Sequence, residues 1–581
     1  MGAPIAMALA CTFCLAGVAD AGEPDAVGEV SVRLVDGGGG GGGGRRLEFQ
    51  FDATGLGDHG SLWLTLDGWG GWPGLDHEYV TVSGASPPLG ARDGTRFPVL
   101  APADWDGSLS VTYSIPLLEI GTPEQQAWNI LPSACGTYAT AALMNTIMRL
   151  DDADGPVAMR RTITIRAPEG WTVATGWAGA SEGVQTSSLP APDDNGVYVI
   201  GRPVGVATGD GGGVACEVYQ FSGGVGGAAR VLSVVRPFVE HVTRTVGAPP
   251  PETVRVCVMG STGGGFLTDH GLVVGLPEGT PDWFLDSPYF RHLICHELYH
   301  TWLGNILQEA QPERTVWFKE GFTDYLSLWH GAACGVLPRE WFVERLLEIE
   351  PEARATSMGR VAFTDPGVDW RDGDGPNEIM AYKGGMVLAF CLDAALREAG
   401  RPGLASMIGQ MIEDGERRYS NQSIRERLRA LGLGEFERRY VSGTEVVSVG
   451  EAMLALGCAR RETATPLGYL GIRVEADQGF GRVVAIDPDG PASDSGFRIG
   501  DIVGGLAPGR SDGASVGDSV ETAYPFGLEL VAPTEEEVSV WVHRGEGEPV
   551  ELRVRPRVIG GGVLSRIELT PKAEAALFGD G

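Results

Sequence analysis

The chain has 581 residues, which is too long for one hydrophobic core and predicts three or four domains. Its formal net charge of -32 argues against a nucleic-acid partner, because the phosphates of nucleic acids bind basic surfaces. Apolar residues make up 43% of the sequence, yet after the N-terminus no apolar run reaches the roughly 18 residues of a transmembrane helix.

The N-terminus is an apolar stretch of small residues, MGAPIAMALACTFCLAGVADAGEPDA. It contains Ala19-Asp20-Ala21, an A-x-A site, so residues 1–21 are predicted to be a secretory signal peptide that leaves Gly22 as the N-terminus. The first residues carry no Lys or Arg, unlike most signal peptides, and a buried helix or a retained anchor is the alternative. A signal peptide would make the protein secreted or periplasmic.

Residues 22–232 are predicted to form an all-β, sandwich-like domain. The segments EVSVRLVD, RLEFQFDA, SLSVTYSI and RTITIRAP alternate apolar and polar residues between clusters of Gly, Pro and Asp. Many short strands with turn signals between them are typical of sandwiches.

Residues 233–460 are predicted to form a mainly helical domain. The segment AARVLSVVRPFVEHVTRTVG has helical spacing and stops before three prolines. Two strand-like segments follow, TVRVCVMG and TDHGLVVGLP, and helical patterns dominate from Pro288 to about Ala455.

The segment HELYH within this domain carries His296, Glu297 and His300. Residues four apart share one face of a helix, so the two imidazoles can bind one ion. A hydrolytic zinc site needs three protein ligands and an open position for water, and Glu297 is placed to act as general base. Two histidines on an ordinary helix are the alternative, because a five-residue motif also arises by chance.

A third ligand is predicted twenty residues downstream, in TVWFKEGFTDYLSL. Glu320 can complete a His-His-Glu set, and Asp324 lies on the same helical face, where it can accept a hydrogen bond from a ligand histidine. The alternative for Glu320 is a solvated glutamate at a helix start, against which its apolar neighbours Trp317 and Phe318 argue.

The segments HELYHTWLGN and VWFKEGFTDYL resemble the gluzincin clan of zinc metallopeptidases, and most of all the glycyl aminopeptidase family. HTWLGN is also similar to the aminopeptidase N family, in which the spacing to the glutamate is usually one residue shorter. The resemblance implies a thermolysin-like catalytic domain behind an N-terminal β domain, one Zn²⁺ per chain, and a peptide or protein substrate.

The resemblance also implies a tyrosine that stabilises the oxyanion, and Tyr382 in AYKGGMVLAF is the matching residue. If Gly385 is the glycine of the family pattern, the tyrosine spacing is kept and Gly384 replaces a basic residue. If Gly384 is that glycine, the tyrosine is shifted by one. A tyrosine of the core or surface is the alternative.

The segment GSTGGGFLTDHG stands where related aminopeptidases carry a glutamate that binds the substrate's α-amine. Asp269 offers the carboxylate there and is predicted either to bind an amine or to open a turn. The run Gly263–Gly265 is predicted to allow a close approach of the backbone. We therefore expect an aminopeptidase-like enzyme, with an endopeptidase of the same chemistry as the alternative.

Residues 461–560 resemble a PDZ domain of bacterial proteases, through LGYLGIRVEA and DPDGPASDSGFRIGDIV, and residues 561–581 would be a tail. The resemblance implies that backbone N–H groups of Leu470, Gly471 and Ile472 bind a peptide C-terminus that adds as a strand. A spacer without a ligand is the alternative. A peptide-binding scaffold with a non-catalytic zinc domain is the second functional hypothesis.

Overall fold

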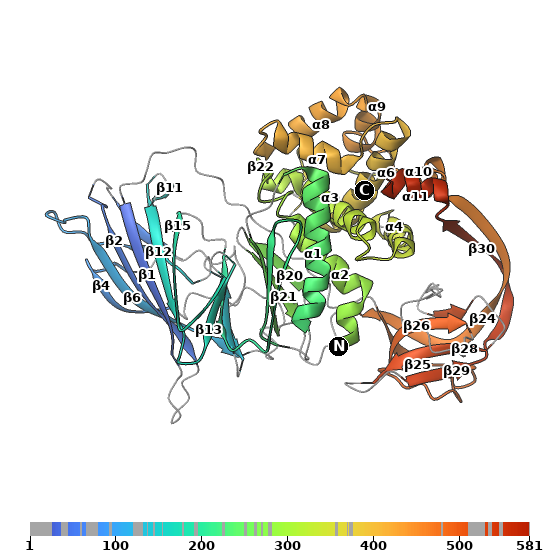
Figure 1. Cartoon of the computed structure of the whole chain (residues 1–581), viewed down its shortest axis with the longest axis horizontal. Coiled ribbons are helices and arrows are strands. Elements are labelled where there is room, and N and C mark those ends of the chain that lie inside the picture. The colour runs from blue at the N-terminus through green and yellow to red at the C-terminus, as the bar shows by residue number, and fades with distance from the viewer. Residues whose placement is uncertain are drawn as a thin grey trace. The chain divides into compact units, whose positions relative to one another are not determined.

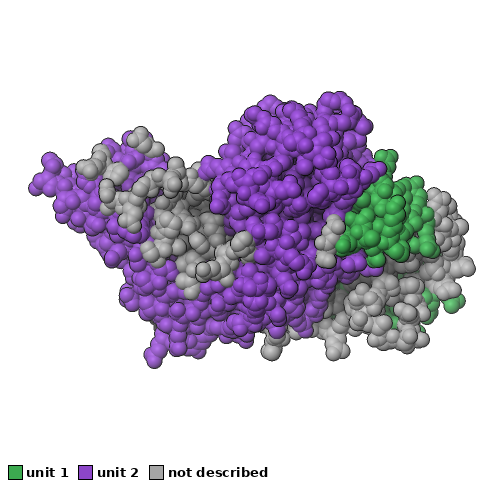
Figure 2. Space-filling view, turned by 45° about the horizontal axis from the view of Figure 1, so that its top comes forward, with its two compact units in different colours: residues 1–8, 279–281, 449–580 green, residues 9–278, 282–448, 581 purple. Residues whose placement is uncertain are grey.

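A computed structural model gives the fold of two compact units, residues 9–278 with 282–448 and residues 449–580 (Figure 2). The structure describes residues 26–35, 45–57, 61–65, 80–91, 96–119, 132–135, 138–142, 146–153, 155–157, 159–176, 179–190, 196–222, 227–248, 253–260, 264–268, 271–276, 282–354, 358–368, 370, 376–477, 480–508, 529–532, 537–544 and 550–579. The predicted signal peptide and Asp269 lie outside these residues.

Three sheets make up the N-terminal part of the larger unit. The first has the order β15 (Val184–Pro190), β12 (Met159–Arg166), β1 (Ala26–Val35), β2 (Arg46–Thr54), β6 (Leu109–Pro116) and β4 (Thr81–Ser86). The second has the order β11 (Gly155–Pro156), β10 (Arg149–Asp152), β3 (Trp63–Thr65) and β5 (Arg96–Pro98). The third has the order β14 (Gly179–Glu182), β13 (Thr172–Thr175), β16 (Val197–Gly201), β9 (Tyr138–Ala142), β8 (Ser133–Cys135) and β7 (Leu118–Glu119).

One apolar cluster joins these three sheets. It buries Val30 of β1, Leu64 of β3 and Ile200 of β16, one residue from each sheet, among many others. Side chains of β1 alternate between buried and exposed, as the pleat of a half-buried strand requires. The predicted N-terminal β region is therefore confirmed.

A five-stranded sheet follows in the order β17 (Gly205–Asp210), β18 (Ala215–Gln220), β19 (Thr253–Gly260), β21 (Gly271–Leu276) and β20 (Gly264–Thr268). Helix α1 (Gly227–Val246) connects the parallel strands β18 and β19 and packs against β17 and β18 (Figure 1). β20 pairs antiparallel to β21 and forms the opposite edge of the sheet.

Helices dominate the rest of the larger unit, as predicted. They are η4 (Asp282–Asp286), α2 (Pro288–Tyr299), α3 (Pro312–Ala333), α4 (Arg339–Arg354), α5 (Pro376–Ile379), η5 (Met380–Gly384), α6 (Gly385–Glu398), α7 (Leu404–Glu413), α8 (Asn421–Ala430), α9 (Gly434–Phe436) and η6 (Glu437–Val441). The short strands β22 (Gln308–Glu309) and β23 (Arg418–Tyr419) pair in parallel between them. α2 packs on α1, α3 and β20, so it joins the sheet to the helices.

One helix of the described residues, Asn377–Glu398, is long and apolar enough to cross a membrane. In its most apolar window 83% of the residues are buried inside the protein, which is also the pattern of a core helix in a globular domain.

The smaller unit contains helices α10 (Val449–Leu456) and α11 (Pro571–Phe578) and one sheet. The sheet has the order β27 (Glu529–Ala532), β24 (Ala459–Asp477), β25 (Phe480–Ile486), β26 (Ile502–Pro508), β28 (Val538–His543) and β29 (Val550–Val554), and β30 (Arg557–Glu568) also pairs with β24. The predicted boundaries at residues 232, 460 and 560 fall inside α1, β24 and β30, so each of them divides a continuous element.

The predicted peptide-binding loop of the PDZ domain lies in β24. Leu470 and Ile472 are buried in the core of the unit, and Gly471 has a φ of 79°. The carbonyl of Leu470 accepts a hydrogen bond from Ala492 N at 2.9 Å, and the carbonyl of Gly471 accepts one from Asp487 N at 2.9 Å. The PDZ assignment itself stays a prediction.

Candidate active site

Helix α2 brings the two motif histidines to one place. Ser287 caps its N-terminus, where the side chain accepts a hydrogen bond from Phe290 N at 3.2 Å, and Pro288 occupies the first turn. His296 and His300 lie one turn apart near the C-terminal end, and both are buried. The motif is therefore on a helix, as its spacing predicted.

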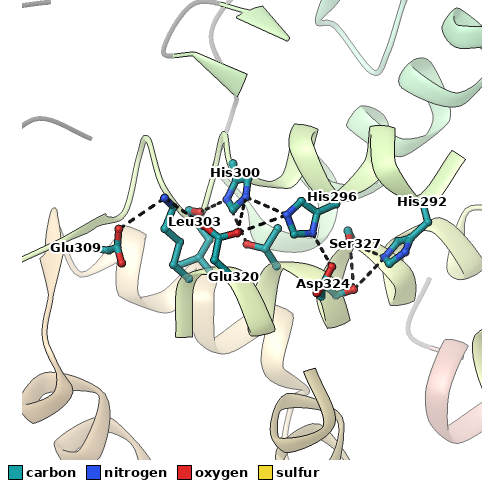
Figure 3. Close-up of polar contacts among 10 residues, drawn as sticks. His292, His296, His300, Leu303, Glu309, Glu320, Asp324 and Ser327 are labelled. Atoms are coloured by element: carbon teal, nitrogen blue, oxygen red, sulfur yellow. Dashed lines mark hydrogen bonds and ion pairs between the residues drawn. The ribbon is translucent and has the colours of Figure 1, made fainter. Parts of the chain in front are cut away.

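The third predicted ligand comes from α3, which packs on α2. Nε2 of His296 and Nε2 of His300 are 3.2 Å apart, and Oε2 of Glu320 lies 3.5 Å from the first and 3.2 Å from the second (Figure 3). Zinc bonds of 2.0–2.1 Å in a tetrahedron separate the ligand atoms by about 3.3 Å. The three atoms therefore have the spacing of a zinc site, and they form the one group of three such ligands among the described residues.

Hydrogen bonds on the far side of each ring set the direction of the ring nitrogens. Nδ1 of His296 donates to Asp324 Oδ1 at 2.7 Å, and Nδ1 of His300 donates to the carbonyl of Leu303 at 3.1 Å. The two Nε2 atoms therefore point toward each other and toward the carboxylate of Glu320. A positive charge between these buried groups stabilises such an arrangement, and either a metal ion or a proton on His296 can supply it.

The electrostatics of the site also favour positive charge. Burial alone would lower the pKa of His296, but Asp324 and Glu320 outweigh it and raise this pKa to about 10. Burial would likewise raise the pKa of Glu320, but His300 and Lys319 hold it well below the ordinary value. Glu320 is therefore a carboxylate, which is the form that binds a metal.

Sequence reasoning missed a buried ion pair beside Glu320. Nζ of Lys319 lies 3.4 Å from Glu320 Oε1 and 3.6 Å from Glu309 Oε2, and Thr315 Oγ1 donates to Glu309 Oε1 at 3.2 Å. Lys319 is 1% exposed and Glu309 6%. The burial of this lysine could not be read from the sequence, because lysine side chains are almost always exposed in folded proteins.

His292 was also missed, although it continues the spacing of His296 and His300 by one more turn of α2. Its Nε2 donates to the carbonyl of Asp324 at 3.1 Å and lies 3.0 Å from Ser327 Oγ (Figure 3). Burial lowers the pKa of His292 to about 4, so the ring is neutral at pH 7. The repeat of three histidines at intervals of four was the signal that could have identified it.

Glu297 is fully buried and lies against the edge strand β20. A Cβ atom added to Gly265 of β20 would lie 2.4 Å from Cγ of Glu297, inside any normal contact. Gly265 therefore permits a close approach of the backbone, as the sequence predicted, and the group approached is the predicted general base, whereas Gly263 lies outside the described residues.

Tyr382 is buried on η5, a π-helical turn that packs against α3. The backbones come close there: a Cβ on Gly321 would lie 2.7 Å from the carbonyl oxygen of Ala381 and 2.4 Å from Cα of Gly385. Gly321 directly follows Glu320, so the turn carrying Tyr382 lies beside the third ligand's helix. Single π-turns inside helices occur frequently at functional sites. The oxyanion role of Tyr382 stays a prediction.

Comparison with solved structures identifies proteins with a similar architecture. An aminopeptidase N family protein from Idiomarina loihiensis matches with a TM-score of 0.64 and 14% sequence identity, over 95% of this chain and 100% of that one. The chain shares the fold of that protein. The M1 zinc metallopeptidase from Deinococcus radiodurans matches with a TM-score of 0.45 and 14% identity, over 74% of this chain and 95% of that one. No protein-family model and no curated protein sequence matches the chain.

The fold comparison confirms the mixed architecture of an N-terminal β region followed by a helical region. The predicted fold is confirmed at this coarser level, whereas the zinc-peptidase activity and the closer assignment to the glycyl aminopeptidase family stay predictions.

Proposed function

We propose that the chain is a zinc-dependent peptidase whose metal is bound by His296, His300 and Glu320. The observation that carries this proposal is the buried triangle of their ligand atoms, with edges of 3.2–3.5 Å. The shared fold with an aminopeptidase N family protein supports the same conclusion. Zinc bound there would lower the pKa of a water molecule and polarise the scissile carbonyl.

The side chains of the site have distinct roles in this proposal. Glu297 takes a proton from the attacking water and passes it to the leaving amine. Asp324 holds the ring of His296 through the 2.7 Å hydrogen bond to Nδ1 and keeps Nε2 available for the metal. Tyr382 donates a hydrogen bond to the oxyanion of the tetrahedral intermediate.

Two substitutions test the chemistry. Glu297→Gln should retain metal and lose hydrolysis by about 10²- to 10⁴-fold, because a general base contributes that much. Glu320→Ala should lose the metal itself. Glu435→Gln is a matched control, because the Glu435 side chain is 72% exposed. The proposal is wrong if the purified wild-type protein binds no stoichiometric zinc.

We further propose that the enzyme removes N-terminal residues. The shared fold and the resemblance to the glycyl aminopeptidase family support this, and an endopeptidase is the competing possibility. Peptides of one sequence with free and acetylated N-termini separate the two, because an aminopeptidase should cleave only the free form. Equal cleavage of both would establish the endopeptidase.

The proposal extends to the N-terminus and the C-terminal unit. N-terminal sequencing of the exported protein should begin at Gly22 if residues 1–21 are a signal peptide. If the C-terminal unit acts as a PDZ domain, it should bind a peptide with a free C-terminal carboxylate and not its amide. A scaffold with a non-catalytic metal would bind such peptides and cleave none, although it would have no use for the buried Glu297.

A further inference from the structure

Lys319 is a buried cation directly beside the third metal ligand. It is one of only three lysines in the chain. Its Nζ lies between two buried carboxylates, 3.4 Å from Glu320 and 3.6 Å from Glu309. A buried ion pair adds little net stability compared with apolar side chains of similar volume, so stability alone does not explain this arrangement.

The two carboxylate oxygens of Glu320 face different partners. Oε2 faces the histidines, 3.2 Å from Nε2 of His300 and 3.5 Å from Nε2 of His296. Oε1 faces Lys319. A carboxylate can bind a metal through one oxygen or through both, and the ammonium group competes with the metal for the second oxygen.

The ammonium group is itself fixed in position. Glu309 is a second carboxylate that attracts it, and Thr315 Oγ1 orients Glu309 through a 3.2 Å hydrogen bond to Oε1. Glu309 belongs to β22, which pairs with β23 at Tyr419. Lys319 is therefore held by a part of the chain that contributes no metal ligand.

We propose that Lys319 is a positioning residue that holds Oε1 of Glu320 away from the metal, so that Glu320 binds through Oε2 alone. A hydrolytic zinc site needs its fourth position open for water, and a second oxygen of Glu320 would compete for it. This inference rests on the proposed zinc function and adds a reason why the site stays open.

The test is the visible absorption spectrum of the Co²⁺-substituted protein, because four-coordinate Co²⁺ absorbs several-fold more strongly than five-coordinate Co²⁺. Wild type should show the strong four-coordinate spectrum. Lys319→Met should lose at least half of the intensity per bound Co²⁺. Lys319→Arg keeps the cation and should retain the wild-type spectrum. Lys572→Met is the matched control, because Lys572 is exposed and lies in the other unit.

A double variant, Lys319→Met with Glu309→Gln, guards against misfolding. It removes both charges of the ion pair, so no charge of the pair is left buried and unpaired, and it should show the same loss of intensity as Lys319→Met. Full intensity in either folded variant would overturn the inference while leaving the zinc function intact. A wild-type protein without bound metal would instead overturn the zinc function, and this inference with it.

Discussion

Gly265 gives the sharpest test of how the fold positions Glu297, the proposed general base. In Gly265→Ala the new Cβ would lie 2.4 Å from Cγ of Glu297, 2.9 Å from Cδ and 3.0 Å from Oε1, whereas ordinary contact begins at 3.4 Å. The side chain or β20 must therefore move by about 1 Å. A displacement of about 1 Å in a reacting group costs about 10²-fold in rate, or about 2.7 kcal/mol of transition-state stabilisation.

The assay is kcat/KM on a free peptide, measured together with the zinc content. Gly265→Ala should keep its zinc, because the three atoms nearest to the added Cβ all belong to Glu297, and should lose about 10²-fold in kcat/KM. Gly84→Ala is the control, because Gly84 also lies in a strand and a Cβ there meets nothing within 4 Å. Wild-type kcat/KM in Gly265→Ala would refute the idea that this close contact positions Glu297.

Three further predictions concern the surroundings of the site. Asp324→Asn should weaken zinc binding by about 10- to 100-fold in a chelator competition, because the charge that orients the ligand histidine is lost. His292 has a folded pKa of about 4, below its unfolded value, so it contributes stability above pH 6.5 that is lost as the pH falls towards 4. That contribution reaches about 3 kcal/mol, and His292→Gln should flatten the pH dependence of the unfolding free energy in this range. Gly385→Ala should destabilise the protein by about 1–3 kcal/mol in urea unfolding, because its Cβ would lie 2.5 Å from the carbonyl oxygen of Trp317, and Gly84→Ala should not.

The proximity of His296 and His300 could be predicted from the sequence because it depends on short-range spacing, and Glu320 could be predicted from the motif that carries it. The interval of four residues between His296 and His300 fixes their common face once the segment is a helix. The same interval of four residues puts Glu320 and Asp324 on one face of their helix. In the structure, Asp324 Oδ1 accepts a hydrogen bond from His296 Nδ1 at 2.7 Å. The alternation of the N-terminal strands is local in the same way.

The ion pair of Lys319 and Glu309 depends on tertiary structure and left no local signal. Glu309 comes from β22, whose position is set by its pairing with β23, more than a hundred residues later in the chain. The domain boundaries failed to coincide with element ends for a related reason. The amino-acid composition changes only gradually along the chain. In addition, β17 and β18 precede the boundary predicted at residue 232, yet they belong to the same sheet as β19, which follows α1.

The contact of Gly321 with Gly385 has a consequence for how the site can move. Backbone lies against backbone there, without side chains that could change rotamer to absorb a displacement. The segment carrying Glu320 and the segment carrying Tyr382 must therefore shift together, as one rigid body.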